Sequence, residues 1–192
     1  MVQGAGPRDG RRRGPTGLTP IEPLGPTELT VGPQPVMGGR SVTFTLMAPG
    51  WVPPAEQVTQ SYGLCFTAEG LVLLVSEADG HWSLPGGTVE AGETTQETLV
   101  REIAEEACAR VVTSEYLACQ HVWDPDHPEG RVSYYQTRWW AKVVLDPWAP
   151  EFETVARQLV DPGAVLETIS WSDTTILGRL LAQAIEVEPS HR

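Results

Sequence analysis

The sequence predicts an α/β fold in which strands surround two amphipathic helices. Six segments of apolar or alternating residues, typical of strands, are separated by turns rich in Gly, Pro and Asp. Two other segments, 94–107 and 174–186, repeat their apolar residues with the period of a helix. The chain has 192 residues and no internal repeat, so we expect one domain and place it at residues 41–192.

Residues 1–40 are expected to form a flexible leader. They contain seven Pro and nine Gly and show almost no apolar periodicity. Strands are then predicted at 41–47, 60–66 and 71–76, with a turn at 67–70 between the last two. The following apolar stretch ends in the turn Pro85-Gly86-Gly87, where glycine permits backbone angles that other residues avoid.

The first predicted helix carries an unusual density of acidic residues. Thr94 and Glu97 have the spacing of a capping box, so the helix is expected to begin here. An apolar stripe indicates packing on a sheet, and three glutamates share the other face: Leu99, Ile103 and Ala107, against Glu102, Glu105 and Glu106. Like charges at this spacing repel one another, whereas Mg²⁺ would reverse that effect because it prefers carboxylate ligands. The ordinary alternative to a metal site is that these glutamates form a solvent-exposed face of the helix.

The second half of the chain predicts three more strands and a second helix. Strand-like runs at 111–123 and 131–145 flank a loop at 124–130. A short strand is predicted at 165–171, and Asp173 is expected to cap the last helix.

Charge and cysteine content exclude several classes of protein. The net charge is −12, and residues 1–40 carry five Arg and three acidic residues, so the remainder carries −14. Binding of nucleic-acid polymers requires basic surfaces and is not expected. The sequence shows neither a transmembrane run nor the apolar core of a signal peptide. Three scattered cysteines fit a reducing compartment, so a cytoplasmic protein with no membrane partner is expected.

The acidic helix and the loop before it resemble the Nudix box of the Nudix (MutT-like) hydrolases. The residues that match in register are Gly87, Glu93, Arg101, Glu102, Ile103, Glu105 and Glu106. The resemblance implies the Nudix fold, an α/β/α sandwich with a mixed β-sheet. It also implies hydrolysis of the pyrophosphate bond of a nucleoside diphosphate linked to another moiety.

The resemblance assigns roles to these residues. Mg²⁺ or Mn²⁺ would be held by Glu102, Glu105 and Glu106, with the Gly86 carbonyl as a further ligand. Glu93 and Arg101 would pair and support the metal ligands. Glu105 is our first candidate for the general base. Glu167, expected near the start of the strand at 165–171, is a weaker candidate for the base or for a contact with substrate.

One position departs from the family pattern. The last glycine of the box is replaced by Cys108, and the next position is the small Ala109. A left-handed conformation is common where a helix ends, and cysteine adopts it at a modest energetic cost. The sequence therefore does not fix how the helix ends after Glu106.

The identity of the substrate is also open. Trp123 is the best candidate for a contact with a nucleobase, whereas Asp124, Asp126 and His127 are interpreted as turn formers more readily than as a metal cluster. The position of Pro125 favours ADP-sugars slightly, and oxidised nucleoside triphosphates are an equal rival. Pyrophosphates of alcohols or cofactors are a further alternative. The expected partner is a small phosphorylated nucleotide, and a homodimer is left open. The alternative function is a catalytically weak Nudix domain that binds nucleotides as a regulatory module.

Overall fold

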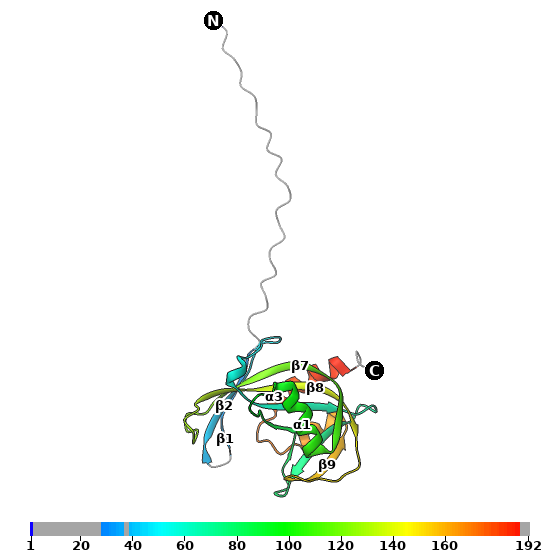
Figure 1. Cartoon of the computed structure of the whole chain (residues 1–192). Helices are drawn as coiled ribbons and strands as arrows, with labels where there is room; N and C mark the ends of the chain where they lie inside the picture. The colour runs from blue at the N-terminus through cyan, green and yellow to red at the C-terminus, as the bar shows by residue number, and fades with distance from the viewer. Residues whose placement is uncertain (2–27, 37–38, 189–192) are drawn as a thin grey trace.

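The computed structural model describes Met1, residues 28–36 and residues 39–188. Its described residues form one nine-stranded sheet with helices packed against it (Figure 1). The strands are β1 (Leu29–Pro35), β2 (Ser41–Leu46), β3 (Val58–Phe66), β4 (Val72–Glu77), β5 (Trp82–Ser83), β6 (Gly86–Thr88), β7 (Ala109–Trp123), β8 (Ser133–Leu145) and β9 (Thr154–Val160). The helices are α1 (Thr95–Ala107), α2 (Val165–Thr168) and α3 (Thr175–Val187), with short 3-10 turns at Ala55–Gln57 and Pro162–Ala164.

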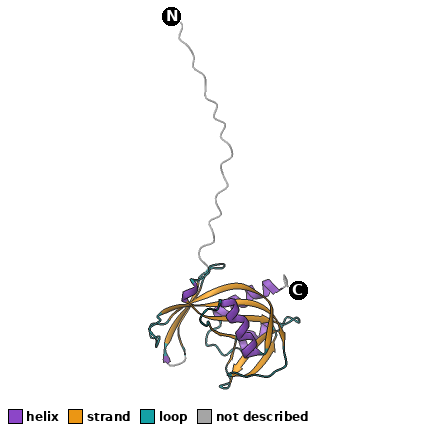
Figure 2. Ribbon diagram, viewed as in Figure 1, coloured by secondary structure: helices purple, strands orange, loops and turns teal. Residues whose placement is uncertain are grey.

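The sheet is mixed, as predicted. Its strands follow the order β1-β2-β7-β8-β3-β4-β5, while β6 pairs with β3 and β9 pairs with β4. The pair β3–β8 at the centre is parallel, and the other pairs are antiparallel. The helix α1 crosses this sheet, as Figure 2 shows.

Two cores lie on the two faces of the sheet. Successive side chains of a strand point to opposite faces, so on β3 Leu64 and Phe66 join one core and Cys65 joins the other. The first core includes the apolar face of α3, and the second includes Leu99 and Ile103 of α1. The α/β/α sandwich is therefore confirmed.

The structure differs from the predicted elements at its margins. Strand β1 lies within residues 1–40, so the leader does not extend to residue 40. This edge strand carries two prolines and an irregularity between Val31 and Gln34, features that a sheet tolerates at its edge. Residues 2–27, which complete the expected leader, lie outside the described residues.

The structure also differs from the predicted secondary structure at three places within the domain. The strand expected at 165–171 is replaced by α2, where the Thr168 hydroxyl donates to the carbonyl of Ala164 one turn earlier. Strand β9 was not predicted, because only its end residues, Thr154 and Val160, are buried and its apolar alternation is weak. Pro85-Gly86-Gly87 is also more than a turn, since Gly86 and Gly87 enter β6 and pair with β3.

Candidate active site

The glycines of β6 bring the backbone close to the acidic helix. A Cβ on Gly87 would lie 2.7 Å from the carboxyl carbon of Glu102, so a side chain here would displace that carboxylate. Gly86 has φ +142, and a Cβ there would lie 2.6 Å from the Cα of Tyr62. Gly86 therefore requires glycine, whereas a side chain at Gly87 would force the Glu102 carboxylate to move.

The helix α1 begins and faces the sheet as predicted. Thr94 accepts a hydrogen bond from the backbone of Glu97, and the Glu97 carboxylate accepts one from the backbone of Thr94 at 2.8 Å. The apolar stripe, Leu99, Ile103 and Ala107, is fully buried. This packing fixes the rotation of the helix and turns its glutamates toward the loop at 88–93.

Arg101 connects the loop and the helix. Its Nε and Nη2 donate to the two oxygens of Glu93, at 2.8 and 3.1 Å, so the expected contact between Glu93 and Arg101 is present. Nη1 also donates to Glu102 at 3.0 Å and to Glu105 at 3.1 Å, and Nη2 donates to the Thr88 carbonyl. One guanidinium therefore interacts with three carboxylates.

The pKa values of these carboxylates shift in opposite directions, according to how deeply each is buried. Hydrogen bonds from Arg101, and then from Thr98, lower the pKa of Glu93 to about 2. Burial raises the pKa of Glu102, although Arg101 opposes this. Burial also raises the pKa of Glu106 to about 7, even though one of its oxygens accepts a hydrogen bond from the Gly86 amide at 2.9 Å. A cation beside Glu102 and Glu106 would relieve this cost.

Two carboxylates that the sequence analysis missed lie in the same electrostatic environment. Glu77, at the end of β4, and Glu153, just before β9, both raise the pKa of Glu106 further. They come from segments distant in the sequence, so no local spacing indicated them.

The donor set around Gly86 fits a hard cation in its chemistry. Glu102 and Glu106 supply carboxylate oxygens next to the backbone of Gly86 and Gly87, which carry no side chains. Mg²⁺ takes oxygen ligands. Glu102 and Glu105 also accept hydrogen bonds from Arg101. In residues 28–36 and 39–188, no three His, Cys, Asp or Glu side chains are arranged to hold a metal.

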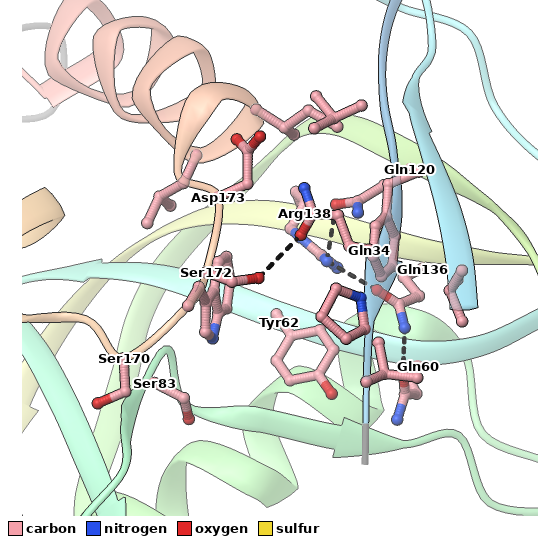
Figure 3. A pocket seen from close by; sticks show the side chains of 18 of the residues that line it. Gln34, Gln60, Tyr62, Ser83, Gln120, Gln136, Arg138, Ser170, Ser172 and Asp173 are labelled. Carbon is pink, nitrogen blue, oxygen red and sulfur yellow. Dashed lines mark hydrogen bonds between the residues drawn. The ribbon is translucent and has the colours of Figure 1, made fainter. Parts of the chain in front are cut away.

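A cavity of about 610 Å³ opens on the α3 face of the sheet. Its polar lining includes Gln60, Tyr62, Gln120, Gln136, Arg138 and Asp173, which converge from β3, β7, β8 and the start of α3 (Figure 3). Tyr62 also pairs with Gly86, and its pKa is raised by burial and by the charges of Glu106 and Glu102. The cavity therefore adjoins the acidic site along β3.

A family model described as a NUDIX domain matches residues 59–180. The chain belongs to the Nudix hydrolase family. This confirms the resemblance predicted from the box.

Individual relatives of this Nudix protein are distant or matched only locally. It is 54% identical over 39 residues to a putative nudix hydrolase 6 of Caenorhabditis elegans, a match that spans 20% of this chain and 15% of that protein. A pyrophosphohydrolase of Bacillus subtilis, BsRppH, has a similar structure, with TM-score 0.63, 24% identity and coverage of 76% of this chain and 92% of the other. The NUDIX domain of Shewanella oneidensis NrtR, solved with ADP ribose, gives TM-score 0.53 at 19% identity, with coverage of 71% and 93%. At these identities the solved structures show the fold.

The end of the Nudix helix shows how the box tolerates Cys108. This residue is left-handed, with φ 46 and ψ 52, and it is the C-cap of α1. Arg157 of β9 donates to the carbonyls of Ala107 and Cys108, at 2.7 and 2.8 Å. A cation at a helix C-terminus is favourable, so Arg157 stabilises an end that lacks the family glycine. The sequence analysis did not identify Arg157, which lies about 50 residues downstream.

The residues predicted to contact substrate are not brought to the cavity. Trp123 is 48% exposed at the end of β7, and Glu167 is exposed on α2; neither lines the cavity. Asp124 is buried and forms an ion pair with Arg40. The loop after Asp124 begins with a turn, in which the His127 amide donates to the Asp124 carbonyl. This agrees with turn formation at Asp124. The aromatic residues that do line the cavity include Tyr134 and Trp171.

None of the helices in residues 28–36 and 39–188 has both the length and the apolar character needed to span a membrane.

Proposed function

We propose that this Nudix protein hydrolyses the pyrophosphate bond of a nucleoside diphosphate linked to another moiety, with Mg²⁺ or Mn²⁺ as cofactor. The observation that carries the proposal is the pair of partly buried carboxylates, Glu102 and Glu106, beside the side-chain-free backbone of Gly86 and Gly87. Buried carboxylates are costly without a counter-charge. A divalent ion held by these two carboxylates would supply that charge.

The residues of the chain divide the work of such a reaction. Glu102, Glu105 and Glu106 would hold the ion, and the Gly86 carbonyl is a further candidate ligand. When bound, the ion would neutralise pyrophosphate oxygens and lower the pKa of a water. Arg101 and Glu93 fix the loop against the helix, so the carboxylates keep their geometry.

Glu105 remains our candidate for the general base. Its contact with Arg101 uses one oxygen, and it is partly exposed on the same face as Glu102. A carboxylate in this position would accept the proton of the attacking water. Glu167 is the less favoured candidate, because it is exposed on α2 and does not line the cavity.

The cavity is the proposed site for the nucleoside. A volume of about 610 Å³ is within the range of small-molecule pockets, and Tyr62, Tyr134 and Trp171 offer aromatic surface. We keep ADP-sugars, nucleoside triphosphates and cofactor pyrophosphates as the substrate groups to distinguish.

The test is a panel of ADP-ribose, dinucleoside polyphosphates and normal and oxidised deoxynucleoside triphosphates, each with and without Mg²⁺. We expect metal-dependent release of phosphorylated products from at least one of them. Glu106→Gln should lower that rate about a hundredfold or more, while Glu186→Gln, an exposed glutamate on α3, should leave it unchanged. Equal rates in the two variants would refute the metal assignment.

A nucleotide-binding regulatory module is the second candidate. The observation in its favour is that Arg101 engages both Glu102 and Glu105, which leaves fewer carboxylates for a metal. Tight nucleotide binding without hydrolysis of any panel member would support this alternative.

A further inference from the structure

Arg138 is an unneutralised cation in the floor of the cavity. Its side chain is 3% exposed, and no carboxylate among the described residues forms an ion pair with it. Its Nε has no hydrogen-bond partner, and its guanidinium stacks 4.8 Å from the centre of the Tyr62 ring. Burial lowers the pKa of Arg138 to about 10, so it still carries its charge at neutral pH. A buried charge without a counterion is costly in the free protein.

The hydrogen bonds of Arg138 orient the glutamines around it. Arginine only donates, so the side-chain oxygens of Gln120 and Gln136 must face it, at 3.0 and 2.8 Å. The amide nitrogen of Gln136 then donates to the oxygen of Gln60. Each glutamine oxygen thereby accepts a hydrogen bond within this cluster, as the dashed lines in Figure 3 show.

The remaining groups of this cluster are donors. The amide nitrogens of Gln60 and Gln120 have no partner among the bonds found in the described residues. We call Gln60, Gln120, Gln136 and Arg138 the Arg138 floor. A surface with a positive charge and unpartnered N–H groups favours a ligand that is anionic and rich in acceptor oxygens. A phosphate monoester has both properties, with a charge of about −1.5 to −2 at neutral pH.

The register of the sheet gives the distance between the floor and the acidic site. Gly86, Tyr62 and Arg138 are partners on the adjacent strands β6, β3 and β8. Two strand spacings separate Gly86 from Arg138, which is about 10 Å along the hydrogen-bonding direction. A group bound at the floor is therefore separate from a pyrophosphate held beside Gly86, yet within the span of one nucleotide.

We propose that the Arg138 floor binds a second phosphate, a monoester on the nucleoside half of the substrate, away from the bond that is cut. The inference rests on the proposed function, because that function places the pyrophosphate beside Gly86. It defines a substrate class: nucleotides that carry a phosphate on the ribose in addition to the pyrophosphate.

The test uses pairs of ligands that differ by one ribose phosphate. Coenzyme A and 3′-dephospho-coenzyme A form one pair, and NADP and NAD form another. The ratio of kcat/KM within each pair is measured with Mg²⁺, and the ratio of Kd is measured by calorimetry in the Glu106→Gln variant. We expect the phosphorylated member to be preferred about tenfold or more in at least one pair, the effect of a hydrogen bond to a charged group.

Matched variants connect that preference to the floor. Arg138→Gln should bring the ratio close to one, and Arg138→Lys, which keeps the charge without the fork, should retain part of it. Arg110→Gln removes an exposed arginine that pairs with Asp146 at the other end of β7, and it should leave the ratio unchanged. If Arg138→Gln does not fold, Gln120→Leu supplies the same test and should reduce the ratio several-fold.

The outcomes separate the two proposals. A ratio near one in both pairs, or a preference that persists in Arg138→Gln, would overturn the second phosphate site. Preferential binding without hydrolysis would support that site and count against the proposed reaction. Hydrolysis of both members at equal rates would support the proposed reaction and count against the second phosphate site.

Discussion

Two arginines on the two sides of β3 show how differently the acidic site and the cavity are built. Arg101 interacts with three carboxylates and has a raised pKa, because the hydrogen bond to Glu93 outweighs burial. Arg138 is more deeply buried, has glutamines in place of carboxylates and has a lowered pKa. Arg101 joins the loop at 88–93 to the acidic helix through its bonds to Glu93 and Thr88. Arg138 has no carboxylate counterion among the described residues, as we expect for a site that binds an anion.

Replacing each arginine by methionine gives the sharpest test of this difference. Arg101→Met leaves Glu93, Glu102 and Glu105 without their partner, and its side chain is 23% exposed, so we expect a loss of about 2–4 kcal/mol in the free energy of unfolding. Activity should fall about 10–100-fold, the effect typical of a residue that positions metal ligands. Arg138→Met removes a charge with no counterion but leaves the oxygens of Gln120 and Gln136 without this donor, so we expect a smaller loss of about 1–2 kcal/mol.

Urea unfolding at pH 7 measures both variants. Equal losses of stability would contradict the distinction between a paired and an unpaired arginine.

The pH dependence of stability should report on Glu106. Its pKa is raised from 4.5 to about 7, so the neutral form is favoured in the folded protein. The stability contributed by this group is complete below about pH 4.5 and is lost as the pH rises through about 7. The loss is about 2 kcal/mol once partial exposure is allowed for. Unfolding at pH 5 and pH 8 in EDTA should therefore show a larger decline for the wild type than for Glu106→Gln.

Added Mg²⁺ provides the control for this prediction. A bound cation favours the ionised carboxylate and should reduce the decline in the wild type. A decline that is identical in the wild type and in Glu106→Gln would show that another group is responsible.

Gly87→Ala tests whether space for Glu102 defines the acidic site. The added methyl group would lie where the Glu102 carboxylate lies, so we expect a loss of about 1–2 kcal/mol in stability, together with reduced activity. Gly163→Ala is the matched control, because nothing lies within 4 Å of its added carbon. The two variants are compared by thermal unfolding and by initial rates with Mg²⁺. An active, fully stable Gly87→Ala would show that Glu102 has room to move.

The contrast between the two regions also explains what the sequence could predict. The acidic site depends on contacts between near neighbours: the capping box at Thr94 and Glu97, and the pairing of Glu93 with Arg101. Such spacings can be recognised in the amino-acid sequence alone. The Arg138 floor joins β3, β7 and β8, so its residues share no spacing, and only the folded sheet brings them together.

The fold follows the same rule. Long strands and amphipathic helices were predicted from their periodicity, and the mixed sheet from the resemblance to the family. Strand β1 was missed because its prolines indicate a loop, although an edge strand accommodates them. The short strand expected near Glu167 was wrong because a few apolar residues fit a helical turn equally well.

The smallest expected effect concerns the end of the Nudix helix. Cys108 is the one non-glycine residue with positive φ in residues 28–36 and 39–188, so Cys108→Gly should relieve strain. Glycine loses more backbone entropy on folding, which leaves a net stabilisation of about 0.5–1 kcal/mol. Cys108→Ala is the matched control, since alanine keeps the strain. Because the helix already ends in the left-handed conformation, held by Arg157, hydrolysis rates should stay unchanged. A sharp rise in activity on Cys108→Gly would show that cysteine displaces the glutamates one turn earlier, and that the acidic site depends on its helix end as strongly as on Arg101.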